Sequence, residues 1–102
     1  MLQIVNLSPD EVSHLLTSPK TVLIDVRETN EFASERIEGA RNFPLSQFDA
    51  AGLPEGDLVL YCAGGARSVR AAEACDAAGV AVVGHLAGGI RAWMAAGLTV
   101  ER

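Results

Sequence analysis

The sequence has few cysteines, no cluster of basic residues and no long apolar run, and each of these absences excludes a class of protein. Its two cysteines, Cys62 and Cys75, are too few and too far apart for a zinc site of the usual spacing. No apolar segment approaches the roughly 20 residues that span a bilayer, so we expect no membrane partner. The first residues show no basic region followed by an apolar stretch, which predicts no signal peptide and a cytoplasmic protein with reduced thiols.

The charge balance argues against a nucleic-acid partner. The formal net charge is −5, and the eight lysines and arginines are scattered along the chain. An anionic ligand would therefore have to be bound by local positive potential. Apolar residues make up 49% and charged residues 21% of the 102 residues, which is ordinary for a globular protein and fits a single domain over 1–102.

Short apolar runs alternate with helical patterns along the whole chain. The first helix has three start signals, with Ser8 as N-cap, Pro9 at the first helical position and Glu11 three residues after the cap. The pattern predicts strands at 2–6, 21–26, 57–62 and 80–86, and a short strand within 39–45 that ends before Pro44. It predicts helices at 9–16, 28–37, 68–79 and 88–97, with a brief helical turn at 46–52. This alternation predicts an α/β fold with about five parallel strands and helices on both faces of the sheet. Asp25, Cys62 and the residues after Leu86 then share one edge of that sheet.

The segment after the strand at 57–62 combines a thiol with a turn of very small residues. It consists of Cys62 followed by Ala63, Gly64, Gly65, Ala66, Arg67 and Ser68. Glycines let the backbone curl tightly, and a curled loop turns successive N–H groups inward to form an anion-binding nest. The helix that follows adds its positive end, which should lower the pKa of the thiol. Arg67 could hydrogen-bond an oxyanion through both ends of its guanidinium.

The pattern alone leaves two interpretations of this segment. In the first, Cys62 is a small buried residue, and the glycines only turn a strand into a helix. In the second, a Cys62 thiolate meets an anionic substrate. The coincidence of thiol, glycines, arginine and helix start favours the second interpretation.

Four segments resemble the rhodanese superfamily, and together they cover nearly the whole chain. "CAGGARS" resembles the active-site loop of that family, and "LIDVRETNEF", "ERIEGARNFPL" and "HLAGGIRAWMAAGLTV" are similar to its other signatures, in the same order. The resemblance implies a three-layer α/β fold around a five-stranded parallel sheet. It also implies sulfur transfer through a cysteine persulfide, with no metal and no organic cofactor.

Carried onto this sequence, the resemblance makes Cys62 the nucleophile that holds the persulfide. Residues 63–68 become the loop that binds the sulfane sulfur and the substrate anion. The implied reaction takes sulfur from thiosulfate or another small anionic persulfide donor to a thiol, cyanide or a protein cysteine. Four residues separate Cys62 from Arg67, as in the sulfurtransferases, whereas the phosphatases of this fold have one more. The alternative is a sulfur-carrier or protein-interaction module with little turnover, and phosphatase or arsenate reductase activity ranks third.

Asp25 and Arg27 match the Asp-Val-Arg triplet of the first family signature, next to the active edge. The chain departs from the family at 35–37, where Glu-Arg-Ile replaces the usual Gly-His-Ile. We expect this difference to change local packing rather than chemistry. We expect His85 to pack or cap rather than react, and Cys75 to be a core residue of its helix rather than a resolving thiol.

Overall fold

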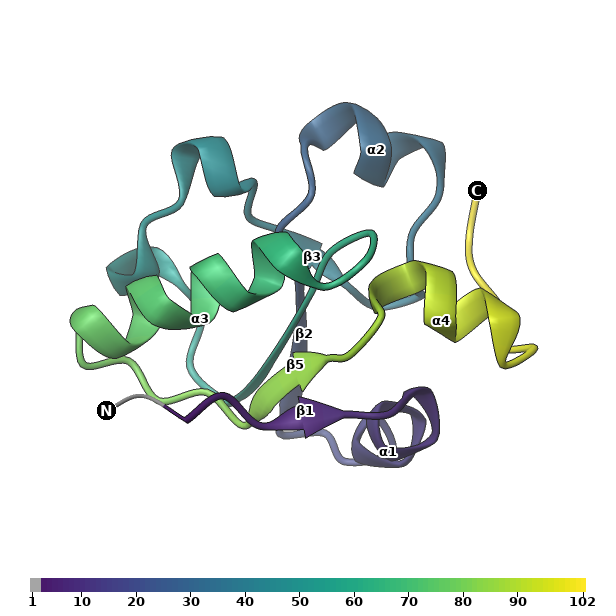
Figure 1. Ribbon diagram of the computed structural model, residues 1–102, viewed down its shortest axis with the longest axis horizontal. Coiled ribbons are helices and arrows are strands. Elements are labelled where there is room, and N and C mark those ends of the chain that lie inside the picture. The colour runs from purple at the N-terminus through teal and green to yellow at the C-terminus, as the bar shows by residue number, and fades with distance from the viewer. Residues whose placement is uncertain (1–2) are drawn as a thin grey trace.

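The computed structural model describes residues 3–102, which form a five-stranded parallel sheet in the order β1-β5-β4-β2-β3 (Figure 1). The strands are β1 (Asn6–Leu7), β2 (Thr21–Asp25), β3 (Arg41–Asn42), β4 (Asp57–Tyr61) and β5 (Gly84–Leu86). The helices are α1 (Pro9–Leu15), α2 (Thr29–Ser34), α3 (Ala66–Ala77) and α4 (Gly89–Ala95), with short 3-10 turns at Leu45–Gln47 and Ala50–Gly52. The predicted α/β fold with five parallel strands is confirmed. No helix within residues 3–102 has both the length and the apolar character to cross a membrane.

The sheet is covered on both faces, so successive residues of a central strand enter different halves of the core. In β4, Val59 and Tyr61 join the cluster built with α1 and α4, whereas Leu58 and Leu60 join the cluster built with α3. A strand buried in this way reads as a continuous apolar run, which is why its sequence shows no alternation. Cys62 continues the alternation and belongs to the cluster on the α3 side. The expected three layers, helix, sheet and helix, are present.

The strands β1 and β5 differ from their predicted bounds. The strand expected at 2–6 lies at Asn6–Leu7, and residue 2 is outside the described part of the chain. The strand expected at 80–86 is restricted to Gly84–Leu86. Both differences follow from pairing, because β1 contacts β5 through two register pairs, Asn6 with His85 and Leu7 with Leu86. Apolar composition extends further along the chain than the hydrogen-bonded ladder does.

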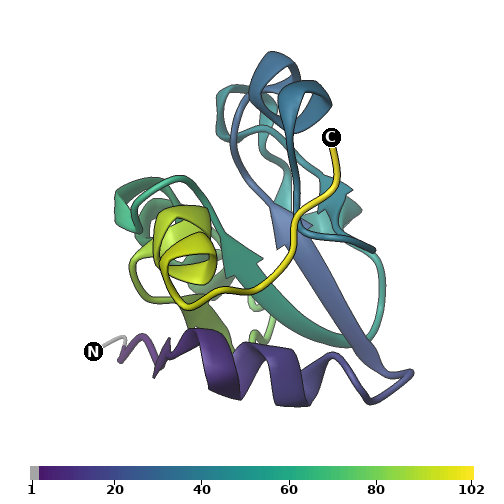
Figure 2. The same ribbon diagram turned by 90° about the vertical axis from the view of Figure 1, so that its right-hand side faces the viewer.

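The register of the central strands brings their carboxyl ends to one edge. Asp25 lies opposite Tyr61, the residue before Cys62, and His85 lies opposite both Leu60 and Asn6. The loop between β4 and α3 and the start of α4 meet at this edge (Figure 1). α1 and α2 lie at opposite ends of the molecule in both views, and the C-terminal segment runs from α4 back towards α2 (Figure 2).

Candidate active site

Cys62 follows β4 directly and lies at the floor of a tightly curled loop. Its Sγ accepts hydrogen bonds from the N–H groups of Gly65 at 3.0 Å and Ser68 at 3.4 Å. Gly65 is the N-cap of α3 and has a φ of 115°, a conformation that a residue with a side chain rarely adopts. The glycine therefore lets the chain reverse around the sulfur. Cys62 is 1% exposed, so the geometry favours small reagents over large ones.

The start of α4 closes the loop from the other side. The N–H groups of Ile90 and Arg91 donate to the carbonyl oxygens of Cys62 at 2.9 Å and Ala63 at 3.2 Å. A methyl group at Gly89 would collide with both of these carbonyls. Gly89 is therefore required by a close approach between backbones.

Hydrogen bonds lower the pKa of the Cys62 thiol even though the residue is buried. Burial alone raises that pKa, because it disfavours the thiolate. The side chain of Ser68 and the N–H groups of Ser68, Gly65 and Gly64 outweigh this effect, and the net shift is downward. The loop is thus arranged to stabilise negative charge on the sulfur.

We predict that the alkylation of Cys62 by iodoacetamide becomes half-maximal at a pH below the ordinary pKa of a cysteine thiol. A lowered pKa means that the thiolate persists to lower pH, so the reaction remains fast there. Ser68→Ala removes the hydroxyl hydrogen bond and should shift the midpoint upward. The measurement is a pH series in a Cys75→Ala background, with Ser13→Ala on α1 as the matched control. An alkylation midpoint at or above the ordinary pKa of cysteine would show that burial raises the pKa of Cys62 at least as much as the hydrogen bonds lower it.

Ser68 is itself held in place by a chain of hydrogen bonds that runs from the buried thiol to Asn6 on β1. Its Oγ lies 3.6 Å from the Cys62 Sγ and 2.8 Å from His85 Nδ1, and His85 Nε2 lies 2.7 Å from Asn6 Oδ1. Burial lowers the pKa of His85 and so favours the neutral ring. The strand register explains this contact, because His85 and Asn6 are paired on neighbouring strands. His85 therefore packs against the site through Ser68. Nothing in the sequence pattern had indicated that Asn6 takes part.

Arg67 forms a two-pronged ion pair with Glu31 of α2. Its Nη1 and Nη2 lie 2.7 and 3.0 Å from the two carboxylate oxygens. The hydrogen bond to Arg67 is the largest cause that lowers the pKa of Glu31, to about 2, and Glu31 raises the pKa of Arg67 in turn. The guanidinium fork expected to face a substrate is thus engaged by a carboxylate 36 residues away in sequence. A contact between Arg67 and a substrate anion stays a prediction, and it requires Arg67 to give up part of this pair.

Arg67→Ala is expected to weaken thiosulfate use about ten-fold, the low end for a lost hydrogen bond to a charged group. We choose the low end because Glu31 already occupies the fork. Arg67→Ala should also raise the pKa of Cys62, since a neighbouring cation is lost. Arg67→Lys keeps the charge but not the guanidinium fork, so it should restore thiosulfate use only in part. Steady-state kinetics with thiosulfate and the alkylation series measure both effects. Unchanged values for Arg67→Ala would make this arginine a structural cap on the loop.

Asp25 and Arg27 form a buried ion pair that supports the edge of the sheet. Arg27 Nη2 lies 2.7 Å from Asp25 Oδ2 and donates to the carbonyl oxygen of Glu35 at 2.6 Å. The segment that departs from the family pattern lies here, and Arg36 also forms an antiparallel bridge with Glu101. These residues tie the end of α2 and the C-terminal segment to the sheet. That the departure changes local packing rather than chemistry stays a prediction.

Cys75 is a fully buried member of the core cluster under α3. Burial raises the pKa of its thiol, and both cysteines are free. These properties describe an unreactive packing residue.

We predict that Cys75→Ala retains sulfur transfer within a few-fold and loses about 1 kcal/mol of stability, because it removes one buried sulfur atom from the core. Denaturant unfolding and thiosulfate turnover measure the two quantities. A variant that still forms a persulfide on Cys62 but no longer turns over would identify Cys75 as a resolving thiol.

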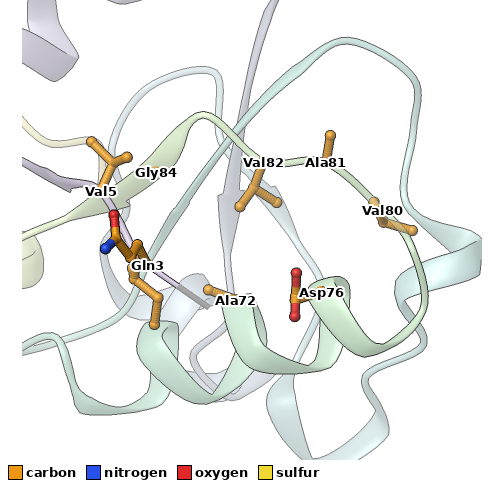
Figure 3. Close-up of a pocket in the computed structure, with 9 residues that line it drawn as sticks. Gln3, Val5, Ala72, Asp76, Val80, Ala81, Val82 and Gly84 are labelled. Carbon is orange, nitrogen blue, oxygen red and sulfur yellow. The ribbon is translucent and has the colours of Figure 1, made fainter. Parts of the chain in front are cut away.

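A cavity of about 190 Å³ lies apart from the cysteine loop, between the later turns of α3, the segment 80–84 that follows it and residues 3–5 (Figure 3). Asp76 is a charged residue among mostly apolar neighbours there. None of the residues from Cys62 to Ser68 lines this cavity. Within residues 3–102, no three histidine, cysteine, aspartate or glutamate side chains are gathered as metal ligands would be.

The structure is a parallel α/β sheet that presents a thiol inside a curled loop, at the carboxyl end of a strand. The chain belongs to the rhodanese-like domain family, whose model matches residues 8–96. It is 38% identical to an uncharacterized protein from Synechocystis sp., over 92% of this chain and 54% of that protein, so it spans about half the length of that relative.

Two further likenesses come from one named enzyme and one solved structure. A thiosulfate sulfurtransferase from Stutzerimonas stutzeri is 32% identical over 83% of this chain and 81% of its own length. The crystal structure of the Alr3790 protein from Anabaena sp. matches with a TM-score of 0.82 and 26% identity, over 92% of this chain and 80% of that chain. A role in sulfur transfer is supported at the level of the family.

Proposed function

We propose that the protein is a sulfurtransferase that moves a sulfane sulfur from thiosulfate or a small persulfide to a thiophilic acceptor through a persulfide on Cys62. The observation that carries the proposal is the environment of the sulfur. Two N–H groups, of Gly65 and Ser68, point at Sγ, and the pKa of the thiol is lowered despite burial. The name of the similar protein from Stutzerimonas stutzeri agrees with this chemistry.

The proposed reaction has two balanced steps. The Cys62 thiolate attacks the outer sulfur of thiosulfate, the bond between the two sulfur atoms of the donor breaks, and sulfite leaves with the electron pair. Cys62 then carries a persulfide anion, whose terminal sulfur lies within the loop from Ala63 to Ser68. Cyanide, a thiol or a protein cysteine attacks that terminal sulfur, and the Cys62 thiolate is released. Neither step calls for a metal or an organic cofactor.

The size of the loop supports sulfur over phosphorus as the atom attacked. Four small residues, Ala63 to Ala66, separate Cys62 from Arg67, and the N–H groups of Gly65 and Ser68 already reach the sulfur. In a phosphatase, the loop must instead surround the transferred phosphoryl group with its three terminal oxygen atoms, which calls for a wider loop. A cytoplasmic location, where thiols stay reduced, remains a prediction from the sequence.

The test is the formation of thiocyanate from thiosulfate and cyanide by the purified protein. We expect continuous turnover with release of sulfite. A persulfide that forms once and is not passed to cyanide or to a low-molecular-weight thiol would instead identify a sulfur carrier. Hydrolysis of a phosphate ester without any persulfide would overturn the proposal in favour of a phosphatase.

A further inference from the structure

A second arginine reaches the cysteine loop from α4. A methyl group placed at Gly64 would stand 3.4 Å from Nη1 of Arg91, so the guanidinium lies against the tip of the loop. The backbone of Arg91 is fixed there by its hydrogen bond to the carbonyl oxygen of Ala63 at 3.2 Å. Arg91 and Gly64 are both exposed. The positive charge therefore stands on the solvent side of the loop, at its tip.

The two arginines near the loop differ in what they already bind. Both ends of the Arg67 guanidinium are engaged by Glu31. Arg91 forms no ion pair with any residue of the described part of the chain. Its charge is therefore available to an incoming anion, whereas that of Arg67 is largely compensated by its partner. The net charge of −5 makes a free cation at this place matter, since the protein as a whole repels anions.

We propose that Arg91 is a specificity-determining residue that attracts and holds the anionic end of the sulfur donor at the mouth of the cysteine loop. The inference rests on the proposed sulfur transfer for its physiological meaning. It predicts a preference for donors with a charged group beyond the transferred sulfur, such as the sulfonate of thiosulfate.

The test compares two alkylating reagents of nearly equal size, iodoacetate, which is an anion, and iodoacetamide, which is neutral. The protein carries Cys75→Ala, so that Cys62 is the sole thiol. In Arg91→Gln the ratio of iodoacetate to iodoacetamide rates should fall about three- to five-fold, as expected for the loss of one exposed charge contact. Arg91→Glu should lower the ratio further, and Arg91→Lys should retain most of it. About 1 M salt should shrink the difference between parent and Arg91→Gln.

Lys20→Gln is the matched control, because it removes one positive charge at the amino end of β2, the opposite edge of the sheet from Cys62. The ratio should not change in that variant. With thiosulfate as donor, Arg91→Gln should raise KM about three- to five-fold and leave kcat nearly unchanged.

An unchanged ratio in Arg91→Gln would overturn the proposal. An equal loss of rate for both reagents would also overturn it, because Arg91 would then support the shape of the loop instead of selecting charge. The alkylation assay involves no sulfur transfer, so it separates this inference from the proposed function. A protein that shows the charge preference but never forms a persulfide would retain the role of Arg91 and refute sulfur transfer.

Discussion

Cys62→Ser is expected to keep the fold and to lose sulfur transfer entirely. An alcohol is not ionised at neutral pH and cannot carry a sulfane sulfur. The hydroxyl is smaller than the thiol, but its oxygen can accept the same hydrogen bonds from the N–H groups of Gly65 and Ser68. The loop should therefore keep its shape. Thiocyanate formation from thiosulfate and cyanide measures the loss, and circular dichroism with thermal unfolding reports the fold.

The control for this prediction is Cys75→Ala, which removes the other thiol of the chain and should remain active. Substantial turnover by a folded Cys62→Ser protein would exclude Cys62 as the nucleophile. Cys62 would then be only a small core residue at the end of a strand, which is the first of the two interpretations that its sequence pattern allowed.

Inserting one alanine between Gly65 and Ala66 is expected to lower sulfur transfer about 100-fold. The present loop places the N–H groups of Gly65 and Ser68 on Sγ at the same time. An extra residue separates these two donors along the chain, and a displacement of about 1 Å at a reacting centre can cost about that factor. The measurement is kcat/KM for thiosulfate, together with the alkylation midpoint of Cys62, which should rise as the hydrogen bonds weaken.

The matched control inserts the same alanine between Gly79 and Val80, at the opposite end of α3 from the cysteine loop. That variant should retain thiosulfate turnover within a few-fold if it folds. Unchanged turnover in the 65–66 insertion would show that the loop tolerates a wider pocket, and the argument from loop length would fail.

Local signals in the sequence predicted the elements that carry the cysteine. The run at 57–62 was recognisable as a strand because it is apolar at nearly every position, and the glycines after it required a tight turn. The capping box of α1 was predictable for the same reason, and it is present, with the Ser8 and Glu11 side chains bonded to each other's N–H groups. These features depend on neighbours within a few residues.

Contacts between distant segments were beyond the reach of the sequence. Glu31 and Arg67 lie 36 residues apart, and nothing in the pattern around either residue indicates that they form a pair. The approach of Arg91 to Gly64 depends on how α4 packs on the loop, which no local pattern encodes. The short β1 and β5 were misplaced for a related reason, since the limit of a parallel strand is set by its partner rather than by its own composition.

The central claim is that Cys62 becomes a persulfide, and intact-mass spectrometry tests it most directly. The protein is incubated with thiosulfate, freed of the reagent and weighed before and after cyanide treatment, and the modified peptide is identified by fragmentation. The account predicts a gain of one sulfur atom on Cys62 that cyanide removes completely, and no gain in Cys62→Ser. An unchanged mass with thiosulfate and with a small persulfide donor, or a sulfur atom carried by Cys75 instead, would contradict it.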